Sequence, residues 1–89
     1  MMELETTNGI VEVELKDHES FSWHLNEARQ YNRMDSVVSH IESTRKMMQA
    51  DGYDLINASV RRSRHRGDVE THETLVYNFA KKGAWKYVD

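Results

Sequence analysis

Residues 35–60 read DSVVSHIESTRKMMQADGYDLINASV, a helical pattern that runs through a glycine directly into a strand pattern. Asp35 can cap the first turn, because its carboxylate accepts from backbone N–H groups that have no partner within the helix. Gly52 suits the left-handed backbone that ends a helix. The sequence therefore predicts a helix over 35–51, with an apolar stripe made of Val37, Val38, Ile41, Met47 and Met48 and with Thr44 in its seam.

Strand patterns follow this helix. Alternation of apolar and polar residues predicts a strand over 53–60, with Ile56, Ala58 and Val60 on one face. A second strand is predicted over 74–80, with Leu75, Tyr77 and Phe79 on one face, and Gly67-Asp68 supplies the turn between the two. Residues 84–88 are expected to add a short edge strand. The stretch after the helix is thus a β-hairpin with an added edge.

The segment before the helix begins with the turn dipeptide Asn8-Gly9, and a short strand near Leu4 precedes it. Residues 10–15 alternate apolar and acidic side chains, so a strand with Val11, Val13 and Leu15 on its core face is expected. Residues 20–25 fit a strand better than a helix, and residues 26–33 fit either. The fold class is therefore α+β: an antiparallel sheet of three to five strands in the order β(β)αββ, with the one main helix packed on one face.

Composition limits the class of protein. The chain has 89 residues, which corresponds to a single domain over 1–89, and 38% of them are hydrophobic. It has no cysteine, so disulfides and thiolate metal sites are excluded and a cytoplasmic location is expected. No apolar stretch approaches the roughly 18 residues that span a membrane, and no secretory leader is visible. The net charge is −3, but residues 1–27 carry seven carboxylates against Lys16, and every arginine follows them.

Residues 47–82 carry a recognisable packing motif. Its first part is Gly52-Tyr53-Asp54-Leu55-Ile56-Asn57-Ala58-Ser59-Val60, and its closing strand is Leu75-Val76-Tyr77-Asn78-Phe79-Ala80-Lys81-Lys82. This stretch resembles a family of small bacterial and phage domains of unknown function with βαββ order. The resemblance implies the fold and no particular activity, since the glycine ends the helix and the aromatic residue begins the strand. In size and shape the chain is also similar to small phage proteins that inhibit host defence systems.

The hexapeptide Arg61-Arg62-Ser63-Arg64-His65-Arg66 stands at the predicted tip of the hairpin. Guanidinium groups bind phosphate with two parallel hydrogen bonds and stack on exposed bases, so this tip is a candidate RNA contact. On a continuing strand, Arg62, Arg64 and Arg66 share the side of Val60, and Arg61 and His65 take the other. Lys81 and Lys82 extend the patch if they fall on the same edge. The competing interpretation is that Asp68, Glu70 and Glu73 lie across the hairpin and neutralise these arginines.

The sequence patterns for metal binding and for catalysis are weaker. The five histidines show no metal-ligand spacing, and no serine lies in a nucleophile motif, so we expect no metal, no cofactor and no enzyme. The hypothesis that follows is a non-enzymatic RNA-binding module with a regulatory or inhibitory role. The alternative is a phage-type anti-defence or antitoxin-like inhibitor that grips a basic host protein through its acidic N-terminal strands. Its predicted interface residues are Glu12, Glu14, Trp85 and Tyr87, and the opposite charges of the two ends also allow a homodimer.

Overall fold

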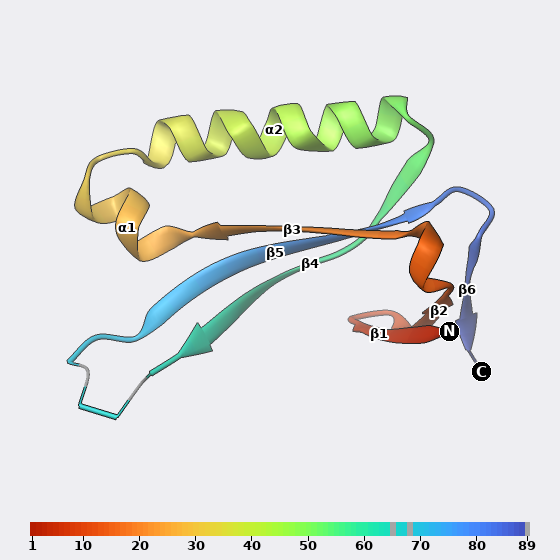
Figure 1. The fold of residues 1–89 in the computed structure, drawn as a ribbon, viewed down its shortest axis with the longest axis horizontal. Coiled ribbons are helices and arrows are strands. Elements are labelled where there is room, and N and C mark those ends of the chain that lie inside the picture. The colour runs from red at the N-terminus through yellow and green to blue at the C-terminus, as the bar shows by residue number, and fades with distance from the viewer. Residues whose placement is uncertain (65, 68, 89) are drawn as a thin grey trace.

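The computed structural model describes residues 1–64, 66–67 and 69–88, and Figure 1 shows one long helix beside twisted antiparallel strands. The elements in chain order are β1 (Met2–Thr6), β2 (Gly9–Val13), the 3-10 turn η1 (Leu15–Asp17), β3 (His18–His24), α1 (Leu25–Gln30), α2 (Met34–Ala50), β4 (Tyr53–Ser63), β5 (His72–Lys81) and β6 (Trp85–Val88). The predicted α+β class, with the main helix against a sheet, is confirmed. The strand expected over 20–25 is β3, but it ends at His24 and Leu25 begins α1. Of the undecided residues 26–33, those up to Gln30 form α1.

The strands of the described residues divide into two sheets, where the sequence predicted one. Sheet A has the order β1-β2-β6 and sheet B the order β3-β5-β4. The division follows from η1, which turns the chain between β2 and β3. Leu15 lies in this turn and is 73% exposed, so its predicted place on the core face with Val11 and Val13 was wrong.

Sheet B has a covered side and an open side. Residues that face each other across antiparallel strands point to the same side, so the odd-numbered residues 73–79 of β5 share one side with Trp23 and Val60. We call this the helix side, because Trp23 Nε1 donates a hydrogen bond of 2.7 Å to His40 Nδ1 of α2. The even-numbered residues 72–80 define the open side. The register skips one residue at Ile56, which therefore lies in a β-bulge, so its predicted place on one face with Ala58 and Val60 was wrong.

Helix α2 covers the helix side with a single row of residues. Thr44 and Met48 are buried and Val37 and Ile41 half-buried, a spacing that keeps all four on one line of the helix. Val38 and Met47, predicted in the same stripe, are each 52% exposed, because they lie about 100° of rotation away from that line. Beneath the row, the rings of Phe21, Trp23, Tyr77 and Phe79 pack edge to face.

The residues at the two ends of α2 determine where the helix begins and how the chain passes into β4. The helix begins at Met34 with Arg33 as N-cap, so Asp35 lies in the first turn and does not cap it as predicted. A sharp corner sets this start: Asn32 has a φ of 54° and Arg33 N–H donates to the Ala28 carbonyl at 2.7 Å. At the other end Gly52 has a φ of 87°, as expected of the residue that turns the chain into β4.

Sheet A lies on the opposite side of sheet B from α2, near the end where β5 finishes (Figure 1). Its inner side carries Val11 and Val13, which are fully buried, as is Ala80 on the open side of sheet B. Hydrogen bonds between described residues join the sheets: Trp85 Nε1 donates to Asp54 at 2.9 Å, and the Asn57 side chain donates to the Glu5 carbonyl at 3.0 Å. Sheet A thus covers one end of the open side and leaves the hairpin end uncovered. No helix within the described ranges is long and apolar enough to cross a membrane.

Candidate nucleic-acid interface

The β4–β5 ladder separates the two arginines at its end. Arg61 lies opposite Thr74, Arg62 opposite Glu73 and Ser63 opposite His72. Because successive residues of a strand point to opposite sides, Arg61 belongs to the open side and Arg62 to the helix side. The alternation that the sequence predicted for this pair is therefore present, with Arg62 on the side of Val60.

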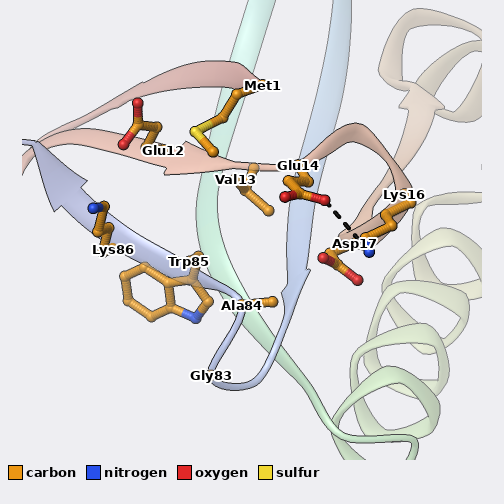
Figure 2. Close-up of a pocket in the computed structure, with 10 residues that line it drawn as sticks. All are labelled: Met1, Glu12, Val13, Glu14, Lys16, Asp17, Gly83, Ala84, Trp85 and Lys86. Carbon is orange, nitrogen blue, oxygen red and sulfur yellow. Dashed lines mark ion pairs between the residues drawn. The ribbon is translucent and has the colours of Figure 1, made fainter.

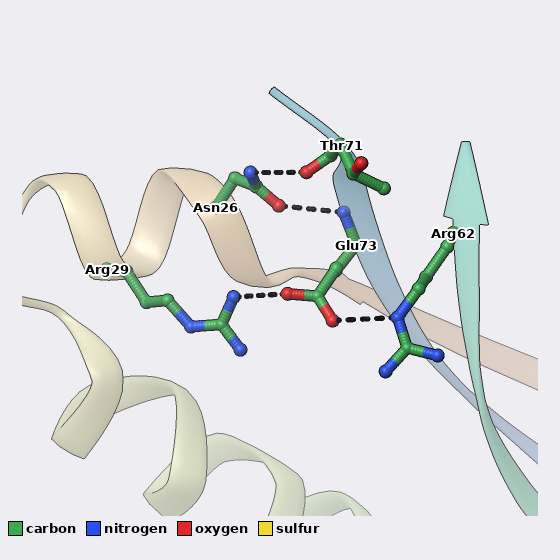
Figure 3. Close-up of polar contacts among 5 residues, drawn as sticks. All are labelled: Asn26, Arg29, Arg62, Thr71 and Glu73. Atoms are coloured by element: carbon green, nitrogen blue, oxygen red, sulfur yellow. Dashed lines mark hydrogen bonds and ion pairs between the residues drawn. The ribbon is translucent and has the colours of Figure 1, made fainter. Parts of the chain in front are cut away.

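On the helix side, Glu73 is held between two arginines (Figure 3). One carboxylate oxygen accepts from Arg29 Nη1 of α1, and the other accepts from Arg62 Nε at 3.3 Å. The hydrogen bond from Arg29 and the positive charges of both arginines lower the pKa of Glu73 below its ordinary value, against a smaller opposing effect of desolvation. Arg62 is therefore engaged in an ion pair within the hairpin. This pair is the neutralising contact that the competing interpretation expected from Glu73.

Asn26 adds a second clamp at the same place (Figure 3). Its side-chain amide donates to the Thr71 carbonyl at 2.9 Å, and its oxygen accepts from the Glu73 N–H at 2.7 Å. Asn26 and Arg29 both come from α1, more than forty residues away in sequence. Sequence reasoning missed both, since nothing near them in the chain indicates a partner on the hairpin.

On the open side, the hairpin end presents small polar side chains around Arg61. Those that are exposed are Ser22, His24, Ser59, Ser63 and His72, and Thr74 and Val76 are half-buried between them. The Thr74 hydroxyl lies 3.3 Å from His24 Nδ1. Within the described residues, the Arg61 side chain forms neither a hydrogen bond nor an ion pair, so its guanidinium is presented to solvent on a surface of hydroxyl and imidazole groups.

Beyond β4, the tip of the hairpin adds two more arginines to this end of the molecule. Arg64 and Arg66 are exposed, and Gly67 takes the turn with a φ of 93°. The predicted contact His65 and the predicted counter-charge Asp68 lie outside the described residues. Glu70, also predicted to neutralise the tip, is exposed and forms no ion pair within the part of the chain that the structure describes.

The lysines predicted to extend the patch lie elsewhere. Lys81 pairs with Tyr53 at the opposite end of the ladder from Arg62. Lys82 follows it and lies 3.8 Å from an Asp54 carboxylate oxygen. The condition for their joining the arginines, a shared edge, is not met.

The four residues of the predicted protein interface do not form one surface. Glu12 points to the outer side of sheet A, whereas Trp85 and Tyr87 pair with Val13 and Val11 on the inner side. Glu14 follows β2 and pairs with Lys16 at 3.4 Å. Glu12, Glu14 and Trp85 do border one hollow of about 330 Å³, whose lining also includes Asp17 and two lysines (Figure 2). Tyr87 lies outside it and packs edge to face on Trp85.

The histidines and carboxylates of the described residues include no group of three placed to hold a metal ion. Comparisons with protein-family models, with curated proteins and with solved structures found no match. The assignment of a function therefore depends on the chemistry of this chain alone, and the resemblance of residues 47–82 to a βαββ family stays an expectation.

Proposed function

We propose that this chain is a non-enzymatic RNA-binding module of the cytoplasm, with a regulatory or inhibitory role, and that it holds RNA on the open side of the β4–β5 hairpin. The observation that carries the proposal is the guanidinium of Arg61, which has no partner in the described residues and stands on an uncovered polar sheet surface. Arg64 and Arg66 extend the same basic end toward the turn. Arg62, Lys81 and Lys82 are not part of the proposed contact.

The surface chemistry favours the RNA backbone over the bases. A guanidinium donates two parallel hydrogen bonds to a phosphate, and the hydroxyls of Ser59, Ser63 and Thr74 can donate to phosphate or ribose oxygens. The described open side carries no Phe, Tyr or Trp, so the exposed planar groups at its hairpin end are His24, His72 and Arg61. We therefore expect binding that tolerates many sequences and prefers single-stranded or irregular RNA, whose backbone can follow a twisted hairpin.

The test compares neighbouring arginines on opposite sides of one strand. Arg61→Gln removes the proposed contact, and Arg62→Gln is the matched control, since it removes the same charge from the side that faces Glu73. Loss of one charge-assisted contact should weaken binding by about tenfold for Arg61→Gln and reduce the salt slope by about one. The affinity of Arg62→Gln for RNA should stay within about twofold of the wild-type affinity, because this variant loses only the long-range attraction of one positive charge.

The measurement is fluorescence anisotropy with a random-sequence single-stranded RNA and, for comparison, a DNA duplex, after the protein has been freed of nucleic acid by nuclease. The ratio of absorbance at 260 and 280 nm before that treatment reports RNA carried from the cell. Equal losses of RNA affinity in the two variants would show that only net charge matters. That result would overturn the proposal that RNA contacts the open side of the hairpin. No binding at low salt would overturn the RNA proposal itself.

The alternative of a protein inhibitor stays a hypothesis. Its predicted residues Glu12, Glu14, Trp85 and Tyr87 are divided between the two sides and the end of sheet A. No single surface of the described structure gathers them.

A further inference from the structure

The outer side of sheet A is an uncovered acidic surface. The register places Glu3, Glu12 and Lys86 in one row across the three strands, and Glu5, Ile10 and Val88 in a neighbouring row. Ile10 and Val88 are 38% and 39% exposed. No ion pair of the described residues involves any of the three glutamates. The surface therefore combines unpaired carboxylates with two exposed aliphatic side chains.

This arrangement has an energetic cost within one molecule. Glu3 and Glu12 face each other directly on adjacent antiparallel strands, where like charges destabilise the pair. Lys86 flanks Glu12 from the other strand, but one ammonium group cannot balance three carboxylates. A cationic group brought from outside would lower the repulsion and gain hydrogen bonds to carboxylate oxygens.

The hairpin tip has the complementary composition. Among its described residues, it carries the exposed Arg61, Arg64 and Arg66 against one exposed carboxylate, Glu70, together with the aliphatic Val69, which is 95% exposed. Figure 1 shows the tip and sheet A at opposite ends of a molecule whose longest extent is 41 Å. A tip therefore cannot reach the sheet A of its own chain, and contact between these two surfaces requires two molecules.

We infer that the outer side of sheet A is a docking surface for the hairpin tip of a second copy of this chain. Arginines of the tip meet Glu3, Glu5 and Glu12, and Val69 meets Ile10 and Val88. Because the two surfaces differ, a pair joined by one such contact leaves one tip and one sheet A unoccupied. Association therefore continues into short open chains or closes as a ring, of which a dimer with both contacts is the smallest. The contact is small and charged, so it is weak and sensitive to salt.

The inference goes beyond RNA binding and is linked to it. RNA and a second copy would compete for the same arginines, so RNA is expected to break the chains into monomers. The association itself needs no RNA, and the glutamates take no part in the proposed RNA contact. Failure of one proposal therefore leaves the other intact.

The test is a charge exchange followed by sedimentation equilibrium on nuclease-treated protein. At low salt the wild-type average mass should rise with concentration, and in high salt it should return to that of the monomer. E3K/E5K has a basic sheet and a basic tip, and R61E/R66E has an acidic sheet and an acidic tip. Each should stay monomeric alone, whereas an equimolar mixture should associate, because both of its contacts are again between opposite charges.

The control is E42K/D51K, which has the same net charge as E3K/E5K but alters only exposed residues on and just after α2. It should associate as the wild type does, and E3K/E5K should still bind RNA. The inference would be overturned by a wild type that is monomeric at every concentration in low salt. Loss of association in the control, or a mixture that stays monomeric, would overturn it equally, because either result leaves no role for the specific pairing.

Discussion

Trp23 and His40 form the polar contact that fixes α2 to sheet B. Trp23 is 8% exposed, and its indole N–H can only donate, so burial requires an acceptor close by. His40 Nδ1 accepts at 2.7 Å, and the two rings meet nearly perpendicular at 5.9 Å. Neutral His40 with its proton on Nε2 satisfies this geometry. The bond selects one position of the helix along the sheet, which apolar packing alone specifies less sharply.

At this residue scale we predict the effect of removing the acceptor. His40→Ala leaves the Trp23 N–H buried without a partner and should lower the free energy of unfolding by about 1–3 kcal/mol, measured by urea denaturation followed by tryptophan fluorescence. His40→Gln offers an amide oxygen in nearly the same place and should recover part of that loss. An alanine variant as stable as the wild type would mean that water replaces the histidine without cost.

The hairpin shows what a local pattern can and cannot predict about an element. Alternation predicted β4 and β5, and it separated Arg61 from Arg62 correctly. It could not say which side would be covered, because that depends on Asn26 and Arg29, which reach the hairpin from a different element. The bulge at Ile56 was missed, although it leaves a trace in the sequence: the apolar alternation changes phase there, from Tyr53 and Leu55 before it to Ala58 and Val60 after it.

At the element scale, Glu73 should make the hairpin sensitive to acid. Its pKa is lowered in the folded chain, mainly by the hydrogen bond from Arg29 and then by the charges of both arginines. A group with a depressed folded pKa stabilises the fold above its unfolded value of 4.5, and that contribution is lost as the pH falls through the folded pKa. Glu73→Gln should therefore melt at a lower temperature than wild type at pH 7, and the difference should shrink below about pH 4.5.

The control for this pH profile is Glu70→Gln, which changes a nearby exposed carboxylate that forms no ion pair within the described chain. Its melting temperature should track the wild type across the same pH range. Thermal denaturation followed by circular dichroism gives both curves. If the difference in melting temperature between wild type and Glu73→Gln were constant with pH, the ion pairs of Glu73 would make no pH-dependent contribution to stability.

The molecule as a whole differs from the prediction in one respect, the division of its strands between two sheets. Each strand was visible in the sequence, but β6 pairs with β2 over a separation of more than seventy residues, from Ile10 to Val88. Hydrophobic alternation shows that a strand has a core face and does not say which neighbour it joins. The place of the proposed RNA contact depends on this division, because sheet A covers only one end of the open side.

The junction between the sheets is the last feature that can be tested. Asp54 accepts from Trp85 Nε1 at 2.9 Å and is the point where β6 is tied to β4. Asp54→Ala leaves a half-buried indole N–H unpaired, so sheet A should open at a lower free energy while sheet B stays closed. In hydrogen exchange, the amides of β2 and β6 should exchange faster, and those of β3 and β5 should be unchanged. Asp51→Ala, at an exposed carboxylate just past α2, should alter neither set. If Asp54→Ala accelerated all strands equally, the two sheets would open as one cooperative unit, and the covered end of the open side could not be exposed separately from the rest of the fold.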